Sequence, residues 1–345
     1  MADPLLIYGA TGYTARLIID EVRRLGVTPI LAGRNGPALA ALGAELGLPW
    51  RVARLDDATR LDAILQDVDV VVHAAGPFGD TAAPMLAACL RNRANYLDIA
   101  GELPAFAASS ARDAEARARA IMVMPGVGFD VVPSDCLAAY VANRCPGADD
   151  LAIGIRGLAQ ATRGSARTLA SYAGTPPVVR RDGELRSVPW QEREFDFGRG
   201  PERSVCISWG DVVSAFHTTA IRNISVYFDI FPGRELSLAA SHLMGSILQL
   251  PVWQTWLRTM SELVMDAPTG NETELAVVAE ATDRRGRRAA ARLRTPDAYR
   301  FTARTAAEIA RRVLGGDFEV GWQTPARVYG PDFVLGFPGV EREDL

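Results

Sequence analysis

The first 125 residues alternate between short apolar runs and segments with helical spacing. Apolar runs of four to eight residues, bounded by turn residues, are typical of strands buried on both faces. Strands that alternate with helices build a doubly wound α/β fold around a parallel sheet. The expected strands are residues 5–9, 28–33, 50–55, 68–75, 95–100 and 121–126, and the expected helices are 13–25, 37–46, 58–66, 80–91 and 104–118.

After a helix predicted near 133–144, polar and apolar positions alternate between turn signals such as RDGE and DRRGRR. This pattern predicts hairpins, so we expect a second α+β domain built on a mainly antiparallel sheet. Further helices are expected near 164–173, 235–264 and 299–314. Residues 174–203 are rich in proline, glycine and charge, and we predict that they are the least ordered stretch, a candidate mobile flap.

Composition narrows the class of protein. The 345 residues suit two domains, and 48% hydrophobic with 23% charged residues is typical of a soluble globular chain. A formal net charge of -4 gives no general attraction to nucleic acid. The cysteines show neither a disulfide framework nor metal-ligand spacing. The first strand begins by Leu5, and polar residues interrupt the apolar stretch 236–264, so we expect a cytoplasmic protein without a membrane span.

The first predicted strand runs into the sequence GATGYTA, whose small residues fall at the turn into the first helix. Missing side chains let backbone amides approach a pyrophosphate, and the helix N-terminus favours its charge. The motif therefore predicts a dinucleotide site in a Rossmann domain, with Ala15 in place of a third glycine. The predicted cofactor-binding residues of this loop are Gly9, Thr11, Gly12, Tyr13 and Thr14.

The second strand ends in LAGRN, where NAD-binding chains commonly place an acidic residue for the ribose hydroxyl. Here Arg34 offers a guanidinium fork suited to a 2′-phosphate, and Asn35 could assist it. We therefore expect NADP, as NADPH, to be the cofactor. The alternative is that Arg34 is a solvated loop residue.

The fourth strand ends in HAAGPFGDT, at the edge of the sheet where ligands of such folds bind. Small residues there would let the backbone pass beside the cofactor, and Phe78 and Thr81 would face its nicotinamide side. An ordinary turn at the end of a strand is the alternative. The cofactor-binding residues predicted here are Ala74, Ala75, Gly76 and Pro77.

Taken in order, GATGYTARLI, LAGRN, HAAGPF, NYLDIAGE, PGVGFDVVPSDCLA and GWQTPARVYGPDF resemble the saccharopine dehydrogenase-like oxidoreductases, a family that includes trans-acting enoyl reductases. The resemblance implies an NADP-binding Rossmann domain over 1–130 and a substrate or dimerisation α+β domain over 131–315. It also implies a C-terminal segment, 316–345, that returns to the first domain, and a cleft near NYLDIAGE and GFDVVPSD.

The cofactor delivers hydride, so the protein needs one proton donor. Asp98 lies within the fifth strand and Glu102 just past its carboxyl end, and Asp130 lies in a stretch that borders the cleft in the family. His217 is expected on a strand of the second domain, where it could face the cleft as an acid. These four residues are the candidate catalytic residues. The alternatives are helix capping and loop hydrogen bonding for the acids.

Other residues are assigned to structure or left open. Tyr96 could donate a proton, although strand aromatics usually pack, and Asp135 could mark either the cleft or a helix start. Cys136 and His73 are expected in the core. Arg163 and Arg167 could bind a substrate carboxylate or phosphate, or lie on an ordinary surface helix. The stretch 236–264 could line an acyl pocket, contact lipid peripherally, form a homodimer interface or belong to the core.

These observations predict an NADP-dependent oxidoreductase that reduces an activated C=C bond of a small or lipid-linked substrate. Reduction of a C=N bond, as in amino-acid dehydrogenases of the saccharopine type, is the first alternative. A non-catalytic NADP-binding redox sensor is the second, because unambiguous acids and bases are few.

Overall fold

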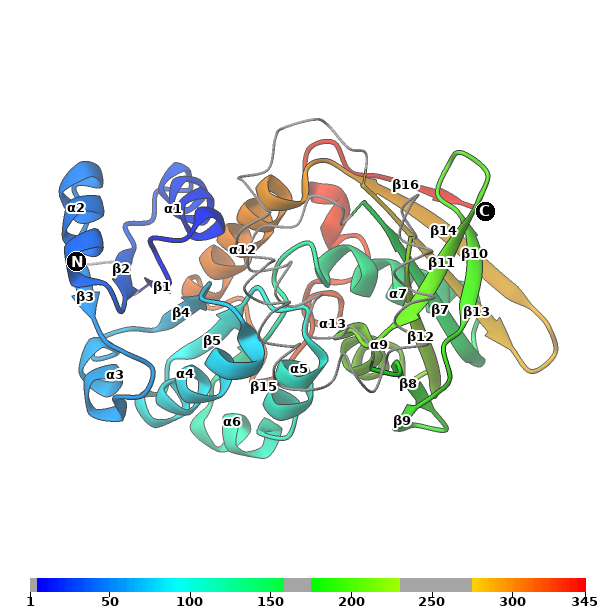
Figure 1. The fold of residues 1–345 in the computed structure, drawn as a ribbon, viewed down its shortest axis with the longest axis horizontal. Coiled ribbons are helices and arrows are strands. Elements are labelled where there is room, and N and C mark those ends of the chain that lie inside the picture. Colours follow the sequence, from blue (N-terminus) through cyan, green and yellow to red (C-terminus); the bar gives the residue numbers. More distant parts are fainter. Residues whose placement is uncertain (1–4, 158–174, 230–274) are drawn as a thin grey trace. The chain divides into compact units, whose positions relative to one another are not determined.

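The computed structural model describes residues 5–157, 175–229 and 275–345 (Figure 1). The chain divides into two compact units, which are unit 1 (Met1–Cys136 and Ala298–Pro338) and unit 2 (Leu137–Asp297 and Gly339–Leu345). Each unit is therefore assembled from two separate stretches of the sequence.

Unit 1 is built on one sheet of seven parallel strands. They are β1 (Leu5–Tyr8), β2 (Ile30–Gly33), β3 (Trp50–Val52), β4 (Val70–His73), β5 (Asn95–Asp98), β6 (Met122–Met124) and β15 (Gly321–Trp322). The strand order is β15-β6-β5-β4-β1-β2-β3. All residues of β1, β2, β4, β5 and β6 are buried, as expected for strands covered on both faces. The order reverses beside β1, so the carboxyl ends of β1 and β4 flank the switch point at which ligands of this fold class bind.

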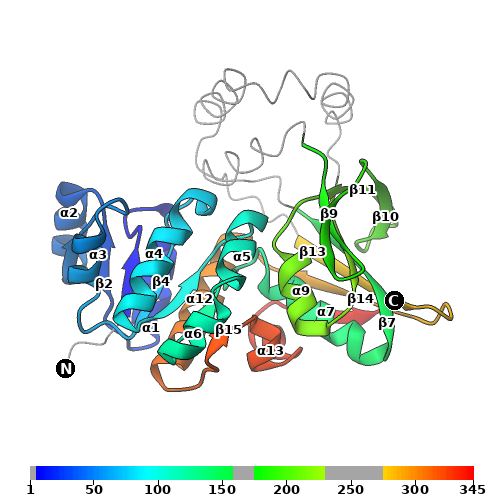
Figure 2. The ribbon, with the colours of Figure 1, turned by 90° about the horizontal axis from the view of Figure 1, so that it is seen from below.

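Helices cover both faces of this sheet (Figures 1 and 2). They are α1 (Tyr13–Arg24), α2 (Gly36–Leu46), α3 (Ala58–Ile64), α4 (Phe78–Asn92), α5 (Leu103–Ser110), α6 (Asp113–Arg119), α12 (Ala298–Leu314) and α13 (Pro325–Tyr329), followed by the 3-10 turn η1 (Phe333–Gly336). α12 packs along α1, and α4 packs against both α3 and α5. α1 buries Ala15, Ile18, Ile19 and Val22, whose spacing of three or four residues makes one apolar face.

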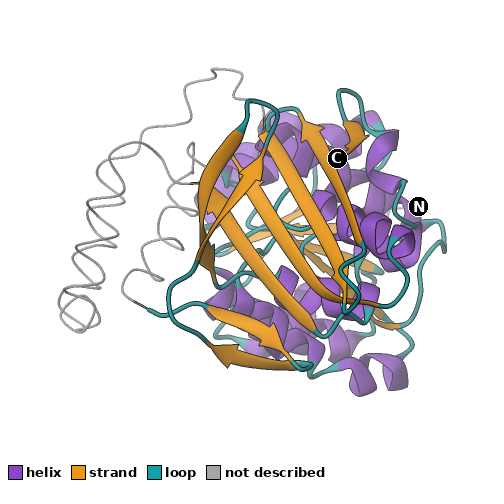
Figure 3. Cartoon of the chain, turned by 90° about the vertical axis from the view of Figure 1, so that its right-hand side faces the viewer, coloured by secondary structure: helices purple, strands orange, loops and turns teal. Residues whose placement is uncertain are grey.

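Unit 2 contains a nine-stranded, mainly antiparallel sheet (Figure 3). Its strands are β7 (Ala148–Arg156), β8 (Val178–Arg181), β9 (Glu184–Ser187), β10 (Glu192–Asp196), β11 (Pro201–Ile207), β12 (Asn223–Asp229), β13 (Leu275–Asp283), β14 (Arg288–Thr295) and β16 (Glu341–Asp344). Seven of them follow the order β10-β11-β12-β7-β13-β14-β16, with β8 on β12 and β9 on β8. Among the described strand pairs of unit 2, only β12–β7 is parallel. The helices are α7 (Val132–Arg144), within which the unit boundary falls, and α9 (Asp211–Thr219).

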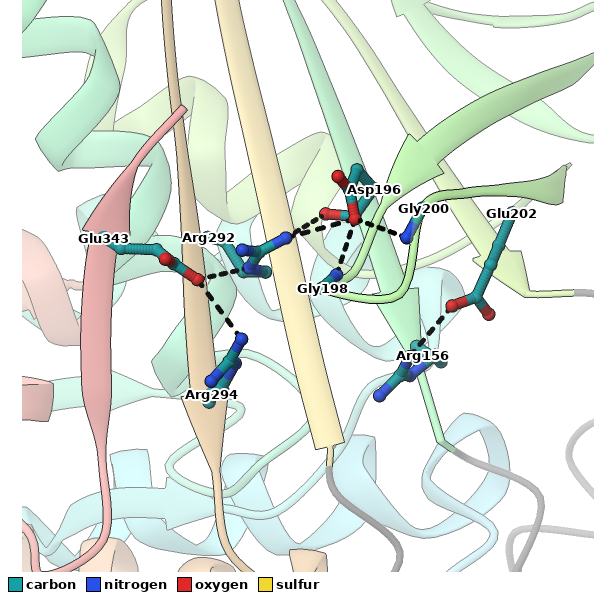
Figure 4. Close-up of polar contacts among 8 residues, drawn as sticks. All are labelled: Arg156, Asp196, Gly198, Gly200, Glu202, Arg292, Arg294 and Glu343. Atoms are coloured by element: carbon teal, nitrogen blue, oxygen red, sulfur yellow. Dashed lines mark hydrogen bonds and ion pairs between the residues drawn. The ribbon is translucent and has the colours of Figure 1, made fainter.

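The stretch predicted as the least ordered, 174–203, contains β8, β9, β10 and the start of β11, so that prediction is wrong for its described strands. Its glycines and charges build a turn instead (Figure 4). One oxygen of Asp196 accepts hydrogen bonds from the amides of Gly198 (2.7 Å) and Gly200 (3.1 Å), and both glycines have positive φ. Arg292 of β14 donates to the same oxygen and to Glu343 of β16, which ties the turn to the sheet.

Two other expectations differ from the structure. His217 lies on α9 and not on a strand, because the apolar residues before it recur with helical spacing. Helix α12, predicted as 299–314, packs in unit 1, and the last strand, β16, pairs with β14 in unit 2. Within the described ranges no helix has the length and apolarity needed to cross a membrane. The stretch 236–264 lies outside those ranges.

Candidate cofactor-binding and active site

The turn after β1 needs glycine at its first position for two reasons. Gly9 has φ +86°, and a Cβ there would lie 2.9 Å from Cβ of Ala75 and 3.0 Å from the backbone of Ala74. β1 and the end of β4 therefore approach each other through bare backbone. A Cβ on Gly12 would lie 3.2 Å from the carbonyl oxygen of Gly9, a closer approach than most Cβ atoms make although less severe than that at Gly9.

Helix α1 begins at Tyr13 with an open N-terminus. Its cap residue, Gly12, supplies no side-chain hydrogen bond, so the first amides of the helix are available to an anion. Thr11 and Tyr13 are exposed, Thr14 is partly exposed, and Ala15 is buried. These features fit the diphosphate of a dinucleotide.

The ring of Tyr13 meets that of Tyr299 on α12 edge to face, with centroids 5.4 Å apart. Tyr299 is far away in the sequence and outside any motif, so sequence reasoning did not select it. Its position at the start of α12 places a second aromatic ring beside the glycine-rich loop.

At the end of β2 the two predicted cofactor residues differ in role. Arg34 is exposed, and within the described part of the chain it makes no ion pair or hydrogen bond. It is therefore available for a 2′-phosphate. The side-chain oxygen of Asn35 already accepts a hydrogen bond from the amide of Ala38 (3.2 Å) and caps α2. The charge of Arg54, like that of Arg34, acts on Tyr8, but Arg54 is engaged by a forked ion pair with Asp56 at 2.8–3.0 Å.

The residues after β4 form the turn into α4. The hydroxyl of Thr81 lies 2.6 Å from the carbonyl of Ala75 and 2.9 Å from that of Pro77, so it can donate to either. The same oxygen lies 3.1 Å from Nε2 of His73, a core residue as predicted. Burial lowers the pKa of His73 to about 3, so its ring stays neutral at physiological pH.

Glu102 approaches the N-terminus of α4 from the start of α5. Oε1 accepts from the amide of Phe78 (3.0 Å) and Oε2 accepts from the amide of Gly79 (2.6 Å). The side chain is nearly buried. A carboxylate thus fills the anion site at the N-terminus of α4, next to the turn expected to contact the nicotinamide.

Asp98 lies at the end of β5 and is fully enclosed. It accepts hydrogen bonds from the amides of Ala100 and Gly126 (both 2.9 Å) and from the hydroxyl of Tyr96 (2.7 Å). Burial raises the pKa of Asp98 to about 6; the three hydrogen bonds oppose this, and the charge of Glu102 adds to it.

Asp130 ends the loop that follows β6. Helix α12 fixes this loop, because Thr302 accepts from the amide of Phe129 (2.9 Å) and Thr305 donates to the carbonyl of Val127 (2.8 Å). Burial of the carboxyl and then the charge of Glu102 raise the pKa of Asp130 to about 7, although part of the residue reaches solvent. The structure therefore brings Asp98, Glu102 and Asp130 together.

Other candidates lie elsewhere or serve the fold. His217 belongs to unit 2. Asp135 is buried and accepts from the amide of Ala326 (2.8 Å), which anchors α13. Cys136 is buried in the core, as expected. Arg163 and Arg167 lie outside the described residues. In the described ranges no group of three acids, histidines or cysteines is placed to hold a metal ion.

Residues 5–124 match the family described as the saccharopine dehydrogenase NADP binding domain. This part of the chain is an NADP-binding domain of the saccharopine dehydrogenase type. The matched NADP-binding domain extends from β1 to β6 and contains the glycine-rich loop, Arg34, Asp98 and Glu102. The NADP cofactor predicted from Arg34 is thereby confirmed, as are the resemblance and the oxidoreductase class.

Relatives extend the likeness beyond the NADP-binding domain. The trans-acting enoyl reductase of Mycobacterium tuberculosis H37Rv is 26% identical over 286 residues, which cover 72% of this chain and 67% of that protein. The trans-acting enoyl reductase of Mycobacterium leprae is 32% identical over 140 residues, which cover 38% and 33%. The structure of saccharopine dehydrogenase (L-Glu forming) from Saccharomyces cerevisiae superposes with a TM-score of 0.65 at 13% identity and covers 99% of both chains. The last comparison confirms the fold class.

Proposed function

We propose that this protein uses NADPH to reduce an activated C=C bond, an enoyl group on a small or lipid-linked substrate. The observation that carries the proposal is the carboxyl cluster of Asp98, Glu102 and Asp130 beside the turn into α4. The relatives named trans-acting enoyl reductases support this substrate class.

The chemistry requires little of the protein. NADPH, when bound, supplies a hydride, and the chain must supply one proton to the second carbon of the double bond. We assign that step to Asp130, whose pKa, raised by burial and then by Glu102, lies at about 7. Donation leaves Asp130 as a carboxylate. The partial exposure of this residue lets it regain a proton from water.

The same cluster favours an enoyl group over an amino-acid substrate. Glu102 already fills the amide pair at the N-terminus of α4, where a substrate carboxylate could otherwise bind. Among the described residues, the charged group whose effect on both Asp98 and Asp130 is resolved is an acid, Glu102. A substrate carboxylate beside these residues would meet negative charge, which disfavours it.

The test is NADPH consumption with a panel of enoyl thioesters of increasing chain length and a panel of cyclic imines. We expect turnover of the thioesters. Asp130→Asn should lower kcat by about 100-fold or more while the NADPH dissociation constant stays the same. Asp57→Asn removes a partly exposed carboxylate that caps α3, far from the cluster in sequence, and serves as the control.

Turnover of imines alone would replace the proposal with amino-acid C–N chemistry. Tight NADPH binding without turnover of either panel would favour the redox sensor. A cytoplasmic location, a homodimer and peripheral contact with lipid stay predictions from the sequence, and size-exclusion chromatography with and without vesicles would test the last two.

A further inference from the structure

Glu102 contacts the N-termini of two helices. Its backbone caps the start of α5, and its side chain binds two successive amides at the start of α4. Both carboxyl oxygens accept a hydrogen bond, as in the ionised form. A Cβ on residue 79 would lie 3.2 Å from Oε2, so glycine at this position leaves room for the carboxylate.

The segment that Glu102 holds is the one next to the cofactor loop. The amide of Phe78 follows Pro77 directly, and the hydroxyl of Thr81, in the first turn of α4, can donate to the carbonyl of Ala75 or to that of Pro77. Ala75 in turn abuts Gly9. One continuous set of contacts therefore joins the Glu102 carboxylate to the glycine-rich loop.

The negative charge of Glu102 also acts on its two acidic neighbours. Asp98 has three hydrogen-bond donors, from Tyr96 on its own strand and from the amides of Ala100 and Gly126, and it is fully enclosed. These donors favour its ionised form and isolate it from water. Asp130 faces the same Glu102 charge but is partly exposed, so it can exchange a proton with solvent.

We propose that Glu102 is a positioning residue and not the proton donor: it fixes the Gly76–Phe78 turn through two backbone hydrogen bonds, and the same bonds hold its negative charge in the carboxyl cluster, where it adds to the effect of burial on Asp130. The effect of Glu102 on Asp130 does not depend on the proposed function. Only the use of the Asp130 proton in the reaction rests on it. The two effects have one origin, because the carboxylate that binds the amides is the charge that opposes ionisation of Asp130.

The proposal is tested without substrate. Side-chain carboxyls of the ¹³C-aspartate-labelled protein are titrated by NMR, and Asp98→Asn and Asp130→Asn assign the two resonances. In the unmodified protein Asp130 should titrate near pH 7. Glu102→Gln, which removes the charge at equal size, should lower that midpoint by about one pH unit. Asp57→Asn, which removes another helix-capping carboxylate, should leave it unchanged.

The positioning effect has a separate readout. Glu102→Ala removes both acceptors and should raise the NADPH dissociation constant about fivefold, the loss typical of a helix cap. Glu102→Asp keeps the charge and should keep the Asp130 midpoint near 7. Loss of affinity in Glu102→Ala with no change in the Asp130 midpoint of Glu102→Gln would overturn the electrostatic half.

An ordinary midpoint for Asp130 in the unmodified protein would overturn the electrostatic half by itself, whether or not the Glu102 variants fold. Unchanged NADPH affinity in a folded Glu102→Ala variant would overturn the positioning half. Neither measurement uses an enoyl substrate. The Asp130 midpoint and the NADPH affinity can therefore be interpreted even if the proposed reaction is wrong.

Discussion

Single residues at the cofactor loop are constrained in different ways, and Arg34 is the one whose role can be isolated. Gly9 cannot change without moving Ala75, so any substitution there alters the fold together with the site. Arg34 is exposed and makes no hydrogen bond or ion pair with the described residues that a substitution would break. A variant at this position therefore reports mainly on the ligand.

Arg34→Ala should weaken NADPH binding by about 10- to 100-fold, the loss of one or two charge-assisted hydrogen bonds, and leave NADH binding unchanged. Fluorescence titration with both nucleotides measures this. Arg54→Ala is the matched control, because that arginine is already paired with Asp56 and should have a smaller effect. Equal losses for NADPH and NADH in Arg34→Ala would contradict a contact with the 2′-phosphate.

Much of the site was predictable at the residue level because it lies where parallel strands end. The apolar pattern locates the strands at whose carboxyl ends the site residues lie. Gly9 and Arg34 directly follow a strand, Ala75 lies two residues after one, and Asp98 is the last residue of another. The pattern does not predict which group each side chain contacts. The caps made by Glu102 and Asn35, and the ring contact of Tyr299, depend on helix ends that are distant in sequence or packed only in three dimensions.

At the scale of elements, the buried strands of unit 1 were predicted well, because burial on both faces gives continuous apolar runs bounded by turn residues. The stretch 174–203 was misread because proline, glycine and charge also build tight turns between strands, as the Asp196 turn does. Helix α12 was predicted from its apolar face, but the sequence of that face does not show which of the two sheets the helix covers.

The contact between α12 and the loop before Asp130 is tight enough to test. A Cβ on Gly128 would lie 2.7 Å from Cγ2 of Thr302, so Gly128→Ala should destabilise unit 1 by about 1–3 kcal/mol through overpacking. Urea unfolding measures this. Thr302→Ser removes the clashing methyl group and keeps the hydroxyl bonded to Phe129, so the double variant should regain part of the loss. Two additive single effects would contradict the contact.

At the scale of the whole chain, unit 1 holds buried groups whose titrations oppose each other. His73 has a pKa of about 3 when folded, below its ordinary 6.5, so the unfolded chain binds the extra proton and stability falls as pH drops from 6.5 towards 3. Asp98 has a pKa of about 6, above its ordinary 3.8, so the folded chain binds the extra proton and stability falls as pH rises from 3.8 to 6.

Each such group changes the unfolding free energy by about 1.4 kcal/mol per pH unit inside its window, so between pH 4 and 6 the effects of His73 and Asp98 nearly cancel. Asp130, with a pKa of about 7, adds a fall in stability with rising pH, so the effect of each substitution is read as a change in slope from the unmodified protein. Asp98→Asn should make the slope of stability against pH more positive by about that amount, and His73→Gln should make it more negative. Urea unfolding from pH 4 to 6 measures both, and the transition that shifts in Gly128→Ala identifies unit 1 in a chain of two units. Parallel slopes for a variant and the unmodified protein would mean that the substituted side chain titrates normally in the folded state.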